Sequence, residues 1–282
     1  MTFDYAMTKI RVTLAQITCK LHNKQENLKR MQDVVRRTRG DIVIFPELSL
    51  TGYMPRDDLF KQAEAVSGPS ISSMVRLAEE TGKDIVFGAP IKDEAVRGVV
   101  YNSSLLASGD GRLFRYDKMY LPTFGPFEER LFFGNGRGAV VAEGAHARVG
   151  LLVCYDVFFP ELSKLETLMG AQILVDISAS PTTSRPNFEK VMPARAVENG
   201  VFFAYSNMVG VHGGLVFNGG STLYNPWGDE LVRAPDLDED VVDCVVDLAD
   251  IDIARRFRPL LRDIRPELLD EIGSLLRRNP RV

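Results

Sequence analysis

Three residues with reactive side chains each stand at the end of a predicted strand. They are Glu47 after residues 42–45, Lys118 at the end of residues 112–118, and Cys154 after residues 149–153. The first and third of these stretches contain only apolar residues and glycine, which is typical of strands buried on both faces. Functional side chains of α/β proteins gather at the carboxyl ends of strands, so this pattern predicts one site.

Together, the three side chains divide the work of attacking an amide. A thiolate can act as the nucleophile, a carboxylate as the general base, and an ammonium group can hold the oxyanion. Each residue also has a purely structural interpretation. Glu47 can cap the loop 48–53, Lys118 can be a solvated strand end, and Cys154 can be a small core thiol. Taken singly each residue favours the structural interpretation, and the combination favours hydrolysis.

Cys154 stands where a strand gives way to a helix. Pro160 suits the first turn of that helix, and Glu161 suits its positive end. A thiol on such a tight elbow lies beside unpaired backbone N–H groups, which can lower its pKa and bind a developing oxyanion.

The elements that must position these residues alternate between strands and helices. The predicted strands are 10–17, 42–45, 84–90, 99–108, 112–118, a strand near 140, 149–153, 171–178 and 201–207, followed by a β meander at 221–225, 230–233 and 241–246. The predicted helices are 23–39, 67–81, 160–169, 186–199, 250–258 and 265–278. This order favours a single α/β domain with a mixed two-sheet core between helical layers.

Composition limits the classes of function. The 282 residues carry a net charge of −4, which gives no case for binding nucleic acid or an anionic membrane. No apolar run reaches the roughly 18 residues of a membrane span. Cysteines 19, 154 and 244 are too widely spaced for a disulfide framework and indicate a reducing cytoplasm. Three scattered histidines argue against a metal site, and no motif calls for a cofactor.

Longer motifs surround the three reactive residues. They are Phe45-Pro46-Glu47-Leu48 with Gly52-Tyr53, Lys118-Met119-Tyr120-Leu121-Pro122 with Glu129, and Cys154-Tyr155-Asp156 with Phe159-Pro160-Glu161. In these motifs the sequence resembles the carbon–nitrogen hydrolase (nitrilase) superfamily, over about residues 9 to 248. The resemblance implies an αββα sandwich at 9–248, a helical tail at 249–282, and a homodimer or larger oligomer formed through the helical face.

The resemblance also implies roles for individual residues. Glu47 would be the general base, Lys118 would stabilise the tetrahedral intermediate, and Cys154 would form a thioester. Glu129 would orient Lys118 and the substrate, and the backbone N–H of Tyr155 would complete the oxyanion hole. Physical chemistry agrees, because two carboxylates keep a buried ammonium charged and an ammonium beside a thiol favours thiolate.

The expected substrate is a small linear primary amide or N-carbamoyl compound. Tyr-Asp follows Cys154 where the nitrile-cleaving branch usually has Trp-Glu, which favours an amide. Expected pocket walls are Tyr53, Phe124, Phe127, Phe158 and Phe159. Near Ser180, Arg185 either holds a substrate carboxylate, as glutamine would present, or is a solvated loop arginine.

Two alternatives remain open. Residues 121–130 and 177–181 resemble the glutaminase domain of glutamine-dependent NAD synthetases, so the chain is a candidate glutaminase subunit that supplies ammonia to a separate synthetase. No Ser-Gly-Gly pyrophosphatase loop is present, so no synthetase activity can reside here. The second alternative is a binding protein that has kept the fold without turnover.

Overall fold

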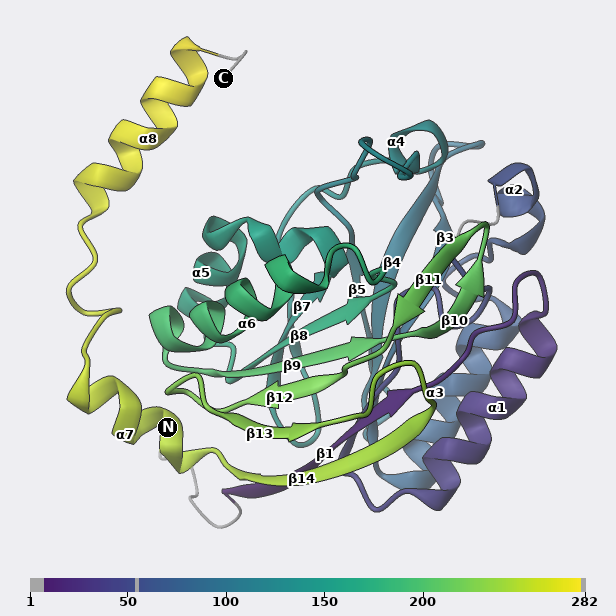
Figure 1. The fold of residues 1–282 in the computed structure, drawn as a ribbon, viewed down its shortest axis with the longest axis horizontal. Coiled ribbons are helices and arrows are strands. Elements are labelled where there is room, and N and C mark those ends of the chain that lie inside the picture. The colour runs from purple at the N-terminus through teal and green to yellow at the C-terminus, as the bar shows by residue number, and fades with distance from the viewer. Residues whose placement is uncertain (1–7, 54–55, 280–282) are drawn as a thin grey trace.

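In a computed structural model, which describes residues 8–53 and 56–279, two six-stranded sheets lie between layers of helices (Figure 1). The first sheet has the order β14-β1-β2-β3-β4-β5 and the second the order β13-β12-β9-β8-β7-β6. The first sheet consists of β1 Lys9–Gln16, β2 Ile42–Ile44, β3 Asp84–Lys92, β4 Val100–Ala107, β5 Leu113–Asp117 and β14 Asp240–Asp247. The second consists of β6 Val141–Glu143, β7 Arg148–Val153, β8 Ile173–Ser178, β9 Phe202–Asn207, β12 Thr222–Tyr224 and β13 Glu230–Arg233.

Helices cover the outer face of each sheet. Helices α1 (Lys24–Arg37) and α3 (Pro69–Thr81) pack together on the first sheet, and α5 (Pro160–Leu168) and α6 (Arg185–Asn199) pack together on the second (Figure 1). The sequence of β2 is apolar throughout because the strand is buried on both faces. Ile42 and Ile44 belong to the core between the sheets, whereas Val43 belongs to the core under α1 and α3. The predicted two-sheet α/β sandwich is therefore confirmed.

The polypeptide after β9 differs from the prediction in two ways. A hairpin, β10 (Val209–His212) and β11 (Leu215–Asn218), was not predicted, and Gly213-Gly214 form its turn. Both glycines have positive φ, which a two-residue hairpin turn requires. The predicted meander is right for its first two strands, which pair antiparallel as β12 and β13, and wrong for its third. Strand β14 leaves β13 and pairs antiparallel with β1 in the other sheet.

The remaining helices are short or peripheral. They are α2 (Leu59–Gln62), α4 (Glu129–Phe132), α7 (Ala249–Phe257) and α8 (Pro266–Arg278). Helix α4 lies in the segment predicted to be a loop, 119–138. Helix α8 stands away from both sheets in Figure 1, and none of its residues is buried. Among the described residues, no helix combines the length and apolar character needed to cross a bilayer.

Candidate active site

Strand ends bring Glu47, Lys118 and Glu129 into one buried cluster. Glu47 follows β2, Lys118 follows β5, and Glu129 begins α4. Lys118 Nζ donates to Glu47 Oε1 and to Glu129 Oε1, each at 2.8 Å. All three side chains are buried, and Lys118 and Glu47 are 0% exposed. Cys154 follows β7, and its pKa responds to the charges of both Glu47 and Lys118, so the four residues form one electrostatic unit.

The ammonium group of Lys118 stays charged in spite of its burial. Burial alone would lower the pKa of Lys118, but the Glu129 and Glu47 carboxylates outweigh it and the pKa is raised well above its ordinary value. The prediction that two carboxylates would hold this lysine charged is therefore confirmed in direction. The site contains a fixed positive charge in a place that excludes water.

Glu47 is held by more donors than the sequence predicted. Asn102 Nδ2 donates to Glu47 Oε1 at 2.6 Å, and the backbone N–H of Ala179 donates to Oε2 at 2.8 Å. Asn102 lies in β4, whose other neighbours are mainly apolar, and a polar amide inside such a strand was the available signal. The Ala179 contact could not be predicted from the sequence, because every residue except proline has a backbone N–H group.

Glu129 is anchored from a second side by Tyr53. The Tyr53 hydroxyl donates to Glu129 Oε1 at 2.7 Å. Burial raises the pKa of Glu129 to about 7, and the Lys118 ammonium opposes this rise. Glu129 Oε2 is buried and has no hydrogen-bond partner among the described residues. Oε1 of Glu129 therefore accepts the hydrogen bonds from Tyr53 and Lys118, and Oε2 accepts none from the described residues.

Cys154 occupies a strained turn between β7 and α5. Its φ is +52°, a conformation that non-glycine residues rarely adopt, and it begins the 3-10 turn Cys154–Phe158. Two carboxylate side chains accept hydrogen bonds from the backbone of this turn. The Cys154 N–H donates to Asp176 Oδ1, and the Val153 N–H donates to Asp156 Oδ2 at 3.0 Å. Of the backbone N–H groups predicted to be unpaired at this elbow, that of Cys154 is therefore occupied, whereas the first turn leaves that of Tyr155 without a helical acceptor.

The Lys118 ammonium favours the thiolate of Cys154, as predicted, but the pKa of this thiol is nevertheless raised. Burial and then the Glu47 charge raise the pKa of Cys154 well above its ordinary value, although Lys118 acts in the opposite direction. The tertiary structure places a carboxylate as well as the ammonium near the sulfur, and removes both from water. Proton transfer must therefore accompany nucleophilic attack.

A cavity of about 150 Å³ opens beside Cys154. It is lined by Pro122, Phe124, Phe127, Cys154, Tyr155, Phe158, Ser180, Pro181, Ser184, Asn187 and Phe188. Phe124, Phe127, Phe158 and Ser180 are therefore placed as predicted. Tyr53 and Phe159 are not among the lining residues. Tyr53 is buried behind the cavity against Glu129, and Phe159 stacks on Tyr120 with ring centroids 3.4 Å apart.

Arg185 is the clearest error among the predicted substrate contacts. Its guanidinium pairs with Glu189 at 2.8 Å and with Asp236 at 2.5 Å, and it lines a separate small hollow beside Arg233. One acidic partner, Glu189, lies one turn further along α6, and the other, Asp236, lies in the β13–β14 connection, which is remote in sequence. It is neither a ligand for substrate in the cavity nor a freely solvated residue.

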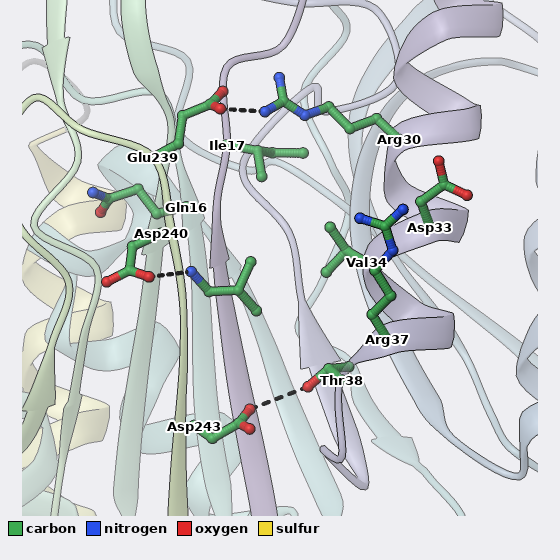
Figure 2. A pocket seen from close by; sticks show the side chains of 11 residues that line it. Gln16, Ile17, Arg30, Asp33, Val34, Arg37, Thr38, Glu239, Asp240 and Asp243 are labelled. Atoms are coloured by element: carbon green, nitrogen blue, oxygen red, sulfur yellow. Dashed lines mark hydrogen bonds and ion pairs between the residues drawn. The ribbon is translucent and has the colours of Figure 1, made fainter.

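A larger hollow of about 550 Å³ lies far from this chemistry, between α1 and β14 (Figure 2). Figure 2 shows that some of its charged side chains have partners within the hollow. Arg30 pairs with Glu239, and Thr38 donates to Asp243. None of the predicted site residues lines it. Among the described residues, no cluster of His, Cys, Asp and Glu is arranged to hold a metal ion.

Comparison with known proteins agrees with this geometry. The family model for carbon-nitrogen hydrolases matches residues 11–256. An (R)-stereoselective amidase from Pseudomonas sp. is 31% identical over 93% of this chain and 94% of its own length. A glutamine-dependent NAD(+) synthetase from Thermotoga maritima is 29% identical over 92% of this chain but only 45% of its own length.

A solved structure shows a similar fold. It is a variant of the amidase from Nesterenkonia sp. AN1 with the acetamide moiety of fluoroacetamide covalently added at its active-site cysteine. The TM-score is 0.78 and the identity 29%, covering 93% of this chain and 96% of that one.

Proposed function

The chain belongs to the carbon–nitrogen hydrolase family, and from this premise we propose that it hydrolyses the C–N bond of a small amide through a thioester on Cys154. The observation that supports this most directly is the buried Lys118 ammonium, held between Glu47 and Glu129 next to a strained cysteine. Glu47 is the general base, Lys118 and the Tyr155 N–H hold the oxyanion, and Glu129 positions Lys118.

The first half of the reaction forms the acyl-enzyme. Cys154 Sγ attacks the amide carbonyl carbon while its proton passes to Glu47, and the carbonyl π electrons move to oxygen. Lys118 stabilises that oxyanion, and it is effective because the site is dry and the charge is already in place. The intermediate then collapses, the C–N bond breaks, and the leaving nitrogen takes the proton from Glu47.

The second half uses the same groups on water. Glu47 removes a proton from a water molecule while the water oxygen attacks the thioester carbonyl carbon. The C–S bond breaks, the sulfur regains the proton, and the product is a carboxylic acid. One carboxylate serves both halves because it starts and ends ionised, and the donors Asn102 and Ala179 keep it in position.

An amide is favoured over a nitrile and over a silent binding protein. Asp156 stands where the nitrile-cleaving branch usually has Glu, and here its carboxylate holds the backbone and a neighbouring tyrosine in place. It accepts from the Tyr116 hydroxyl at 2.8 Å and from the Tyr120 N–H at 3.0 Å, and so cannot be exchanged for the longer Glu without rearrangement. A binding protein would have no need to keep a charged lysine buried between two carboxylates, since that arrangement is costly to fold.

The test is to trap the thioester. After rapid quenching, intact mass spectrometry of protein mixed with an amide should show an acyl adduct on Cys154. Cys154→Ala should lose the adduct and at least ~10⁴-fold in turnover, the scale expected for removal of a nucleophile. Cys244→Ala is the matched control, because Cys244 is distant from the cluster and should keep both. Ordinary turnover by Cys154→Ala would exclude the mechanism.

A further inference from the structure

No charged side chain of the described residues lines the cavity beside Cys154, so beyond the reacting carbonyl the acyl group meets only neutral groups. Among the described residues that line it, the polar members other than Cys154 and Tyr155 are Ser180, Ser184 and Asn187, which are all neutral. The nearest arginine along the chain, Arg185, is already paired with two carboxylates and lines a different hollow. A substrate carboxylate would therefore lose its hydration without gaining a cation to replace it.

The walls of this cavity are aromatic and in mutual contact. Tyr155 meets Phe124 with ring centroids 5.2 Å apart and Phe158 at 5.7 Å, and Phe158 meets Phe188 at 5.0 Å. The rings meet edge to face or tilted, as aromatic rings in packed interiors prefer. Rings from the segment 122–127, from the elbow and from α6 thus contact one another around the cavity.

The volume limits the size of the group that fits. The cavity holds about 150 Å³, and an engineered apolar cavity of about that volume accommodates benzene. A branched alkyl group or a single six-membered ring is therefore the size of acyl substituent that fills the cavity. Ser180 lines the cavity, and its buried hydroxyl, which lies beside the Tyr205 phenol, offers one neutral polar group to the substrate.

We infer that the substrate is an amide with an uncharged, mainly apolar acyl group no larger than a single ring, and that amides with a terminal carboxylate, glutamine included, are rejected. This inference rests on the proposed function. Its physical basis is the cost of burying an unpaired carboxylate among aromatic side chains, which one neutral hydroxyl does not offset. The glutaminase alternative is disfavoured on the same ground.

The test compares two amides of equal length. Pentanamide and the monoamide of glutaric acid have acyl chains of the same carbon number and differ in a terminal carboxylate. The value of kcat/KM should be at least about 100-fold higher for pentanamide, and benzamide should also be accepted. Cys154→Ala should bind pentanamide and not the glutaric monoamide, as measured by calorimetry. Equal binding or turnover of the charged amide would overturn the inference while leaving the thioester mechanism intact.

A charge placed in the wall should reverse the preference. Ser184 lines the cavity, is half-buried and makes no capping hydrogen bond to α6, so Ser184→Arg introduces a guanidinium without removing a helix cap. We expect it to raise kcat/KM for the glutaric monoamide relative to pentanamide at least 10-fold. Thr183→Arg is the matched control, because Thr183 is exposed and outside the lining. The same shift in both variants, or in neither, would contradict the assignment.

Discussion

At the scale of single residues, the site depends on one ammonium group that is buried and yet charged. Lys118 donates to Glu47 and Glu129 at equal distances, so its position is set from two directions. A point charge with rotatable donors fits this arrangement, whereas a planar fork does not. The position therefore demands a lysine, and charge alone is insufficient.

We predict that Lys118→Arg does not preserve activity. The guanidinium is longer and would direct its donors past the oxyanion, so kcat should fall at least about 100-fold, the scale for loss of one oxyanion donor. Steady-state kinetics with a neutral amide measures this. Lys190→Arg, at an exposed position of α6, is the control and should retain full activity. A near-normal kcat for Lys118→Arg would show that Lys118 is a bystander.

The Tyr53 hydroxyl gives a second prediction at this scale, concerning pH. The pKa of Glu129 is about 7, and the hydrogen bond from Tyr53 lowers it by favouring the ionised form. Tyr53→Phe removes that bond, so the pKa of Glu129 rises. Below this pKa Glu129 is neutral and supports the Lys118 charge less well. The acidic limb of the kcat/KM profile should therefore move to higher pH in Tyr53→Phe.

The control for this experiment is Tyr101→Phe. The Tyr101 hydroxyl donates to Asp93, and its side chain points to the opposite face of β4 from that of Asn102, so its loss should leave the profile unchanged. An acidic limb in Tyr53→Phe that coincides with that of the wild type would show that Glu129 does not govern the limb.

At the scale of elements, β7, the elbow and α5 enclose a carboxyl group that the mechanism does not use. Glu166 is 0% exposed on the inner face of α5, and hydrogen bonding from the backbone at Val140 and Leu151 is too weak to offset the burial of its carboxyl group. Gly150 makes room for it, since a Cβ at that position would lie 2.6 Å from Glu166 Oε2. Burial, and then the Asp156 charge, raise the pKa of Glu166 well above its ordinary value.

This raised pKa predicts how Glu166→Gln changes stability. Above the ordinary glutamate pKa of about 4.3, the unfolded chain releases this proton while the folded protein keeps it. The wild type is therefore destabilised as pH rises from that value toward the folded pKa of Glu166. Glu166→Gln removes the effect. At pH 8 its free energy of unfolding should therefore be higher than that of the wild type by about 1–3 kcal/mol. The gain should vanish near pH 4.

Chemical denaturation across this pH range measures the difference. Glu80→Gln, at an exposed position of α3, provides the matched control and should change stability little at any pH. A Glu166→Gln variant that is less stable than the wild type at pH 8 would mean that the carboxylate has a stabilising partner.

At the scale of the whole molecule, apolar side chains remain exposed on α5 and α8. On α5, Leu162 faces the protein interior, whereas Leu165 and Leu168 are about half exposed. Helix α8 stands clear of the sheets with five exposed leucine and isoleucine side chains: Leu268, Leu269, Ile272, Leu275 and Leu276. A helix of 13 residues is marginal in water without a partner, so this surface indicates association.

We predict a homodimer or a larger homo-oligomer. Its sedimentation mass at micromolar concentration should be at least twice the chain mass of 31.4 kDa. A double variant, Leu165→Glu with Leu168→Glu, should lower that mass by adding charges to the interface. Val96→Glu, at an exposed apolar position in the β3–β4 connection, is the control. A wild-type mass near that of one chain would exclude the prediction.

The local pattern of the sequence was enough to predict the fold class and the positions of Glu47, Lys118 and Cys154 at strand ends. Runs of apolar residues report burial within a few positions, and this is a local property. Pro160 at the start of α5 follows from proline geometry in the same way. The motifs around these residues also sufficed to identify the family, because they combine reactive side chains with the turns that hold them.

Contacts between remote segments were decided only by the tertiary structure. Asp176 reaches the Cys154 N–H from a neighbouring strand, and Asp236 withdraws Arg185 from the substrate across 51 positions of sequence. Strand β14 joins β1 from the far end of the chain. The protonated state of Cys154 was likewise beyond local reasoning. It depends on the balance between burial, Glu47 and Lys118, which come together only when both sheets are folded.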